Sequence, residues 1–136
     1  MTAAQKASKT MNILLWIAQS ILAFGFIWSA GMKLLEPAEK LVAMWPWTSG
    51  HSGLVIFTGV IDFLAGIGLI LPTMLRIQPK LTVFAAYGAI VLMITASIFH
   101  ISRGEASVIG VNIVFGILAV FVAWGRLRKA PIQPKS

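Results

Sequence analysis

Cysteine is absent from the 136-residue sequence. The protein therefore forms no disulfide and has no thiol redox pair, no cysteine-ligated iron–sulfur cluster and no cysteine nucleophile. The sequence also lacks a glycine-rich phosphate loop, a serine–histidine–aspartate arrangement and paired carboxylates with metal-ligand spacing. Its two histidines, His51 and His100, show no haem or metal signature. We predict no metal site, and whether the protein is an enzyme stays open.

Charged residues are scarce and are mostly basic. They make up 11% of the chain, against about 25% in a typical soluble domain, while 58% of the residues are hydrophobic and the mean hydropathy is +0.89. A soluble core does not require this composition, so it indicates a lipid environment. The net charge of +7 comes from residues that flank the apolar runs and form no patch with interleaved aromatics, which argues against nucleic acid as a partner.

Four apolar stretches are each about long enough to cross a ~30 Å hydrocarbon layer as a helix. They cover approximately residues 12–35, 53–72, 81–101 and 108–124, with short tails at 1–11 and 125–136. The runs are continuous rather than alternating, which excludes a membrane barrel. The first run is too long for the core of a signal peptide, so we expect a retained helix. The predicted fold is an all-α, polytopic membrane four-helix bundle that forms one transmembrane domain over residues 1–136.

The distribution of Lys and Arg predicts the orientation of this bundle. Three basic residues lie in the first and third connections, together with three of the four acids. Eight lie in the two tails and the second connection: Lys6, Lys9, Arg76, Lys80, Arg126, Arg128, Lys129 and Lys135. Cytoplasmic loops carry such an excess, so both termini should be cytoplasmic. We place Trp16 and Trp124 near the inner interface and Trp45 and Trp47 near the outer one, and we expect Trp28 to pack inside.

The connection between the first two spans is predicted to contain a short helix on the outer surface. Pro37 suits the first position of a helix, and acids occupy the first turn. The Pro46 to Gly53 segment would then return the chain to the membrane. An unstructured loop is the alternative interpretation.

Asp62 interrupts an otherwise apolar span about 13 Å from its start, near the bilayer midplane. An isolated charge at this depth costs on the order of 3 kcal/mol, so the side chain should face the bundle interior. Polar residues of the other spans, Ser29, Lys33, His100 and Asn112, lie at compatible depths, and the tilt of the Cα–Cβ bonds makes them converge. We predict an outer-half pocket with an apolar floor. Asp62 is its candidate proton relay, and the candidate ligand-binding residues are Trp28, Ser29, Lys33, Asp62, His100 and Asn112.

Each polar residue also has a purely structural interpretation. Asp62 and Asn112 could form hydrogen bonds that hold helices together, Lys33 could extend to the interface, and His100 could meet water at a helix end. Stripes of small residues accompany the polar ones, for example Gly25 with Ser29 and Gly59 with Asp62. Such stripes indicate close helix packing in lipid, so the polar residues should lie on packing faces.

Three segments together resemble the DoxX family, in its DoxX-like branch of small bacterial membrane proteins. They are "FGFIWSAGMKLLEP", "GVIDFLAGIGLILP", and "SIFHISRGE" with the following "VNIVFGILAVFVAWGR". The resemblance covers the chain from about Ile13 to Arg126 and implies a four-helix membrane fold in the bacterial inner membrane. In the family the second-helix acid is commonly glutamate, whereas this chain has the shorter Asp62, so a direct ion pair with Lys33 is less expected.

The resemblance implies a link to membrane redox systems, since one family member is a subunit of a thiosulfate:quinone oxidoreductase, while distant eukaryotic relatives act as assembly chaperones. Three functions follow as hypotheses: a redox-associated subunit that binds a quinone or another amphipathic molecule, a structural or assembly partner of a membrane complex, and a small proton-coupled transporter. No cofactor is evident in the sequence, so electrons would come from a bound cofactor or a redox partner protein. Four helices can enclose a pocket within one chain, so a homo-oligomer is permitted but not required.

Overall fold

A computed structural model describes residues 2–134 of the protein. Its four long helices are α1 (Ala3–Leu35), α3 (Ser52–Leu75), α4 (Lys80–Ser102) and α5 (Gly110–Trp124), and α5 continues into a π-helical turn, η3 (Gly125–Lys129). Residues 2–134 contain no strand. Helices α1, α3 and α4, and α5 together with η3 (Gly110–Lys129), are long and apolar enough to cross a membrane. The predicted all-α fold with four membrane-spanning helices is therefore confirmed.

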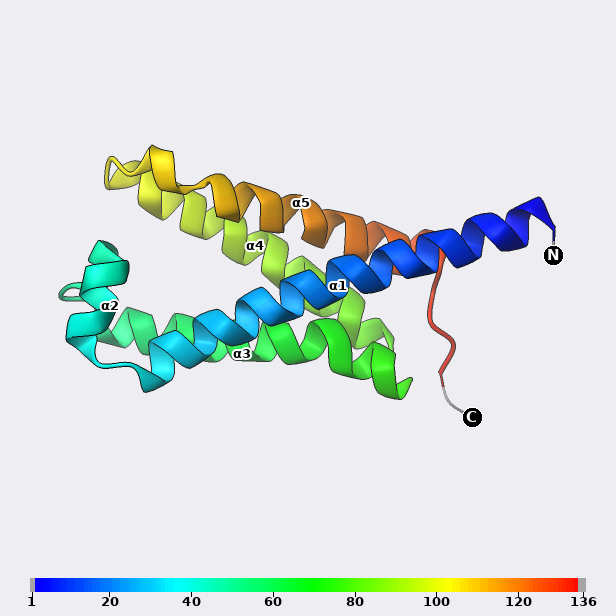
Figure 1. Ribbon diagram of the computed structural model, residues 1–136, viewed down its shortest axis with the longest axis horizontal. Coiled ribbons are helices and arrows are strands. Elements are labelled where there is room, and N and C mark those ends of the chain that lie inside the picture. The colour runs from blue at the N-terminus through cyan, green and yellow to red at the C-terminus, as the bar shows by residue number, and fades with distance from the viewer. Residues whose placement is uncertain (1, 135–136) are drawn as a thin grey trace.

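The helices pack as two antiparallel pairs, α1 with α3 and α4 with α5 (Figure 1). The pairs lie close together near the C-terminal end of α5 and diverge toward the connections at residues 36–51 and 103–109. We call the diverging end the cavity end. The opposite end, which carries the α3–α4 connection and η3, is the terminal end. A cavity lined by all four long helices lies between the pairs at the cavity end.

Helix α1 begins nine residues earlier than predicted, so most of the expected N-terminal tail is helical. Thr2 caps this helix: its hydroxyl accepts a hydrogen bond from the Gln5 amide at 3.1 Å, while the Gln5 side chain accepts one from the Thr2 amide at 2.7 Å. This reciprocal capping box satisfies two backbone donors at the helix start. The hydropathy of the sequence identified only the apolar part of this helix, because its first turns consist largely of polar residues.

Helix α3 also extends past its predicted end at Pro72, to Leu75. A proline deprives a helix of one backbone donor, and transmembrane helices tolerate this loss where neighbouring groups compensate. The helix ends instead at Arg76, whose backbone is left-handed with a φ of 57°. The α3–α4 connection is consequently only a few residues long and brings Arg76 close to the start of α4.

The α1–α3 connection contains the short helix α2 (Ala38–Met44) and a 3₁₀ turn, η1 (Pro46–Thr48). Pro37 is the N-cap of α2 rather than its first helical residue, and Glu39 lies in the first turn. Both elements lie across the cavity end (Figure 1). That this end is the outer surface of the membrane stays a prediction.

Small residues allow the helices to approach closely on the faces that the stripes of small residues predicted to be packing faces. A β-carbon at Gly25 of α1 would overlap the Phe115 ring of α5, and one at Gly66 of α3 would lie 2.7 Å from the Ile27 side chain of α1. Between these contacts lies a core of fully buried apolar residues that includes Leu22, Leu69 and Ala86. The closely packed core holds the helices rigidly below the cavity end.

The orientation can be tested with one cysteine at each end of a chain that has none of its own. In intact cells Ser49→Cys, in the α1–α3 connection, is expected to react with a membrane-impermeant thiol reagent, because the positive-inside rule places this connection outside. Ile77→Cys, at a side chain that is 59% exposed in the α3–α4 connection, is expected to react only after permeabilisation. The reverse labelling pattern would overturn the predicted topology.

Candidate functional site

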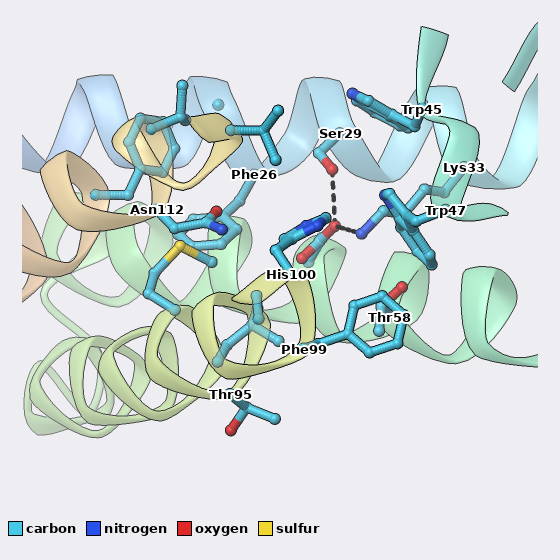
Figure 2. A pocket seen from close by; sticks show the side chains of 18 of the residues that line it. Phe26, Ser29, Lys33, Trp45, Trp47, Thr58, Thr95, Phe99, His100 and Asn112 are labelled. Carbon is cyan, nitrogen blue, oxygen red and sulfur yellow. Dashed lines mark hydrogen bonds and ion pairs between the residues drawn. The ribbon is translucent and has the colours of Figure 1, made fainter. Parts of the chain in front are cut away.

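A cavity of about 530 Å³ opens between the two helix pairs at the cavity end. All four long helices and the α1–α3 connection line it. Figure 2 shows its polar and aromatic side chains gathered around one space. All six predicted ligand-binding residues are among those that line it: Trp28, Ser29, Lys33, Asp62, His100 and Asn112. The six side chains, which were inferred to converge from helix direction and depth, thus line one cavity in the fold.

Lys33 and Asp62 form a direct ion pair at the wall of this cavity. The Lys33 Nζ lies 2.8 Å from the Asp62 Oδ2, and the Ser29 hydroxyl donates to the same oxygen at 2.8 Å (Figure 2). The Lys33 and Asp62 side chains are only 11% and 4% exposed. The shorter aspartate made this direct pair less expected, but the pair forms because α1 and α3 pack closely here. A β-carbon at Gly59, less than one turn from Asp62, would lie 3.1 Å from the Lys33 β-carbon.

Several polar atoms at the cavity remain without a protein partner. In residues 2–134 nothing donates to the Asp62 Oδ1, and the Asn112 amide has no hydrogen bond. The Lys33 ammonium carries three donors, of which one is used by Asp62. These unused donors and acceptors could form hydrogen bonds with a polar group that enters the cavity.

The ring of His100 is fixed by the α4–α5 connection. Its Nδ1 lies 3.1 Å from the Glu105 Oε1, and the Arg103 Nε donates to the same oxygen at 2.9 Å. The hydrogen bonds from His100 and Arg103 lower the pKa of Glu105 from its usual value of 4.5. His100 was predicted to belong to the site, but Glu105 was identified only as a topology signal. The sequence did contain a signal for this contact, because Glu105 follows His100 by five residues, directly after Gly104.

Aromatic rings form much of the remaining wall. The Trp47 ring lies 5.5 Å from the Lys33 Nζ and meets Phe99 edge-to-face at 5.8 Å. Trp28 and Trp45 form a second edge-to-face pair at 5.8 Å. Trp28 was expected to pack inside, but it is 49% exposed, because in the described residues its ring meets Trp45 at the cavity wall and is not enclosed by the core. The cavity thus combines a polar cluster with flat apolar surfaces.

The pKa of Glu105 provides a test of the His100 environment. In ¹³C-edited NMR the Glu105 carboxyl is expected to titrate below 4.5, and Arg103→Gln is expected to raise this pKa by removing one stabilising donor. Because the folded-state pKa is lowered, the stabilisation is complete above about pH 4.5 and is lost as the pH falls through the folded-state value. Lys40→Gln, which removes a cation paired with Glu36 in the other connection, serves as the control. A wild-type value at or above 4.5 would contradict this geometry.

The fold and the cavity define a polytopic α-helical membrane protein with a buried ion pair between its first two spans. A family model described as the DoxX-like family matches residues 17–122. The chain therefore belongs to the DoxX-like family. The match covers every polar residue of the cavity wall discussed above. Comparisons with curated proteins and with solved structures found no match.

Proposed function

We propose that this DoxX-like protein binds an amphipathic small molecule of the quinone class in the cavity, as a redox-associated subunit of the bacterial inner membrane. One observation carries the proposal: unpartnered polar atoms cluster on one wall of a cavity that is otherwise aromatic and apolar. A volume of about 530 Å³ lies within the roughly 300–1,000 Å³ range of small-molecule sites. A purely structural ion pair needs no such space beside it.

The residues present fit the two parts of such a ligand. The Lys33 ammonium and the Asn112 amide offer hydrogen-bond donors to carbonyl oxygens, and the Trp47 and Phe99 rings offer surfaces for a flat ring. Trp28, which lines the cavity and is half-exposed, offers an apolar surface along which the tail of the ligand would extend toward the lipid. A bound quinone would supply two-electron, two-proton redox chemistry, with electrons from a partner protein.

Asp62 is positioned to hold a proton near such a head group. Its Oδ2 is occupied by Lys33 and Ser29, whereas its Oδ1 has no donor in the described part of the chain. A carboxyl group with one free oxygen and one fixed oxygen can accept or release a proton without moving. His100, held by Glu105, is a second group on the cavity wall that can carry a proton.

Tryptophan fluorescence provides the test, because three of the five tryptophans line the cavity. In a Trp16→Phe/Trp124→Phe variant, which keeps only Trp28, Trp45 and Trp47, a short-tail ubiquinone is expected to quench the emission saturably at micromolar concentration. Mass spectrometry and ultraviolet absorption of protein purified in mild detergent are expected to reveal a co-purified quinone. Linear, unsaturable quenching together with a stoichiometric protein partner would instead favour the assembly function.

A further inference from the structure

A second buried polar cluster lies at the terminal end, remote from the cavity. Gln19 of α1, which is fully buried, donates to the Leu69 carbonyl at 2.6 Å and to the Thr73 hydroxyl at 3.3 Å. The Thr73 and Thr82 hydroxyls lie 2.7 Å apart, which links α3 to α4. On its other side the Gln19 Oε1 accepts a hydrogen bond from the Arg126 Nε at 2.6 Å. One glutamine thus connects three helices to a buried guanidinium.

Among residues 2–134, no carboxylate pairs with the buried cation Arg126. Its side chain is held by neutral acceptors, since Nη1 donates to the Asn12 side chain at 2.6 Å and to the Ala130 carbonyl at 2.9 Å. The residue is 4% exposed, and its Nη2 has no hydrogen-bond acceptor in the part of the chain that the structure describes. Buried charges are normally paired, because an unpaired one costs several kcal/mol. This guanidinium therefore lacks the anion that would balance it.

None of the four acidic side chains of the sequence balances the charge of Arg126. Of these four, Asp62 pairs with Lys33, Glu105 with Arg103 and Glu36 with Lys40, and Glu39 lies in α2 at the cavity end. The π-helical turn η3 begins at the residue before Arg126 and is closed by a hydrogen bond from the Ala130 amide to the Gly125 carbonyl at 2.8 Å. Such turns are frequent at functional sites, where they re-aim side chains. The widened turn directs Arg126 into the bundle.

Arg126 also lines a hollow of about 700 Å³ under the C-terminal segment. Two further cations, Arg76 and Lys80 of the α3–α4 connection, line the same hollow, and no acid does. The Arg76 Nε donates to the Gln133 carbonyl at 3.0 Å, which holds the C-terminal segment across it. Ile77, Leu127 and Ile132 add an apolar side. We call this site, defined by Arg76, Lys80 and Arg126, the basic hollow.

We propose that the basic hollow binds a phosphate group, and that the source of this phosphate is the head group of an anionic phospholipid. Three cations line one space, and one of them, Arg126, has a buried guanidinium nitrogen without an acceptor in the described residues. Such a set of cations matches the charge and the oxygens of a phosphate. The site lies at the end of the α5 span, where the predicted topology places lipid head groups, and basic pockets between spans bind such lipids. Its apolar side would accommodate the start of an acyl chain. Inorganic phosphate could form the same contacts with the cations, but it has no acyl chain to pack against the apolar side of the hollow.

Thermal unfolding of the full chain in nanodiscs tests this proposal. In wild-type protein, discs with 30 mol% phosphatidylglycerol are expected to raise Tm by several degrees over phosphatidylcholine discs, whereas inorganic phosphate added to phosphatidylcholine discs is expected to raise it little. The variant Arg76→Gln/Lys80→Gln changes only exposed side chains of the hollow, so it should fold and lose at least half of this increase. Lys6→Gln/Lys9→Gln removes the same charge from exposed residues that do not line the hollow and should keep the full increase.

Native mass spectrometry of the same proteins provides an independent measurement. One phosphatidylglycerol molecule is expected to remain bound to wild-type protein, with about tenfold lower occupancy in Arg76→Gln/Lys80→Gln. Equal stabilisation by inorganic phosphate and by the lipid would overturn the lipid source while keeping the phosphate site. Equal losses in the Lys6/Lys9 control variant would overturn the site itself, since the effect would then be one of total charge. The absence of any stabilisation by either probe would also overturn it.

Discussion

Asp62→Asn is expected to yield a folded protein that binds the short-tail quinone at least tenfold more weakly than wild type. Asparagine keeps the size of the side chain and an oxygen for the Ser29 hydroxyl, so the free energy of unfolding should fall by no more than about 1.5 kcal/mol. The neutral amide cannot hold the Lys33 ammonium as the carboxylate does at 2.8 Å. The ligand would lose the charge-assisted hydrogen bond from an oriented Lys33, which contributes about 1.5–3 kcal/mol and corresponds to roughly 10- to 150-fold in affinity.

Lys33→Met is expected to cause a similar loss of quinone affinity, and the double variant should lose little more than either single variant. Residues that act as a pair show such non-additivity in a double-mutant cycle. Asp62→Leu differs from Asp62→Asn, because it also removes every hydrogen-bond acceptor for the buried Lys33 ammonium and the Ser29 hydroxyl, and it should destabilise the fold by about 3–5 kcal/mol. Thr58→Val, which removes another hydroxyl at the cavity wall, is the matched control. Unchanged quinone affinity in Asp62→Asn would reduce the carboxylate to a helix-packing residue.

A large loss of stability is also expected at the other end of the bundle, from Gln19→Leu. Leucine fills a similar volume but removes the acceptor of the Arg126 Nε and the donor to the Leu69 carbonyl. Leaving a buried charged group without its hydrogen bond is costly, and we expect a loss of about 3 kcal/mol in the free energy of unfolding. Unfolding in mixed micelles with increasing mole fraction of sodium dodecyl sulfate would measure it.

Two further variants identify the cause of this loss. Ser20→Leu makes the same kind of change at the next residue, which is exposed on the bundle surface, and should alter the stability by less than about 0.5 kcal/mol. Gln19→Glu keeps an acceptor for Arg126 and adds the missing negative charge, so it should be clearly more stable than Gln19→Leu. A Gln19→Leu protein as stable as Ser20→Leu would show that the buried network contributes nothing to the fold.

The four helices could be predicted from the sequence because lipid imposes a length and a composition on every span. The ends of the helices could not, since they depend on local hydrogen bonding that hydropathy does not report. The capping box of Thr2 and Gln5 extends α1 through polar residues, and α3 continues past Pro72 until the backbone turns left-handed at Arg76. The divergence of the helix pairs that opens the cavity depends on side-chain packing between distant parts of the chain.

The polar part of the site was predictable because a charged residue within a span must find partners, and few were available at the right depth. The direct Lys33–Asp62 pair was less expected from the sequence, because the close contact at Gly59 that compensates for the short side chain is a tertiary feature. The aromatic wall was interpreted as an interfacial belt, which uses the same residue types. Whether these residues bind a ligand is the part that residue type and depth alone cannot determine.

The buried network around Arg126 was missed for a different reason. Basic residues after a last span are usual topology signals, so Arg126 was grouped with Arg128 and Lys129. Gln19, a single amide within a long apolar run, was the available signal, since an unpaired amide in lipid would be costly. Pairing it with Arg126 required the arrangement of α1 against η3.

Photolabelling with an azido-benzoquinone in nanodiscs, followed by peptide mass spectrometry, tests the central claim most directly. The ligand-binding cavity predicts adducts on the segments that carry Trp47 and Phe99, whose rings lie 5.8 Å apart at the cavity wall. Excess short-tail quinone should abolish these adducts, and Asp62→Asn should reduce them at least tenfold. Labelling confined to exposed residues of the bundle surface, such as Phe24 and Val91, and unaffected by the competitor would contradict a quinone site in this cavity.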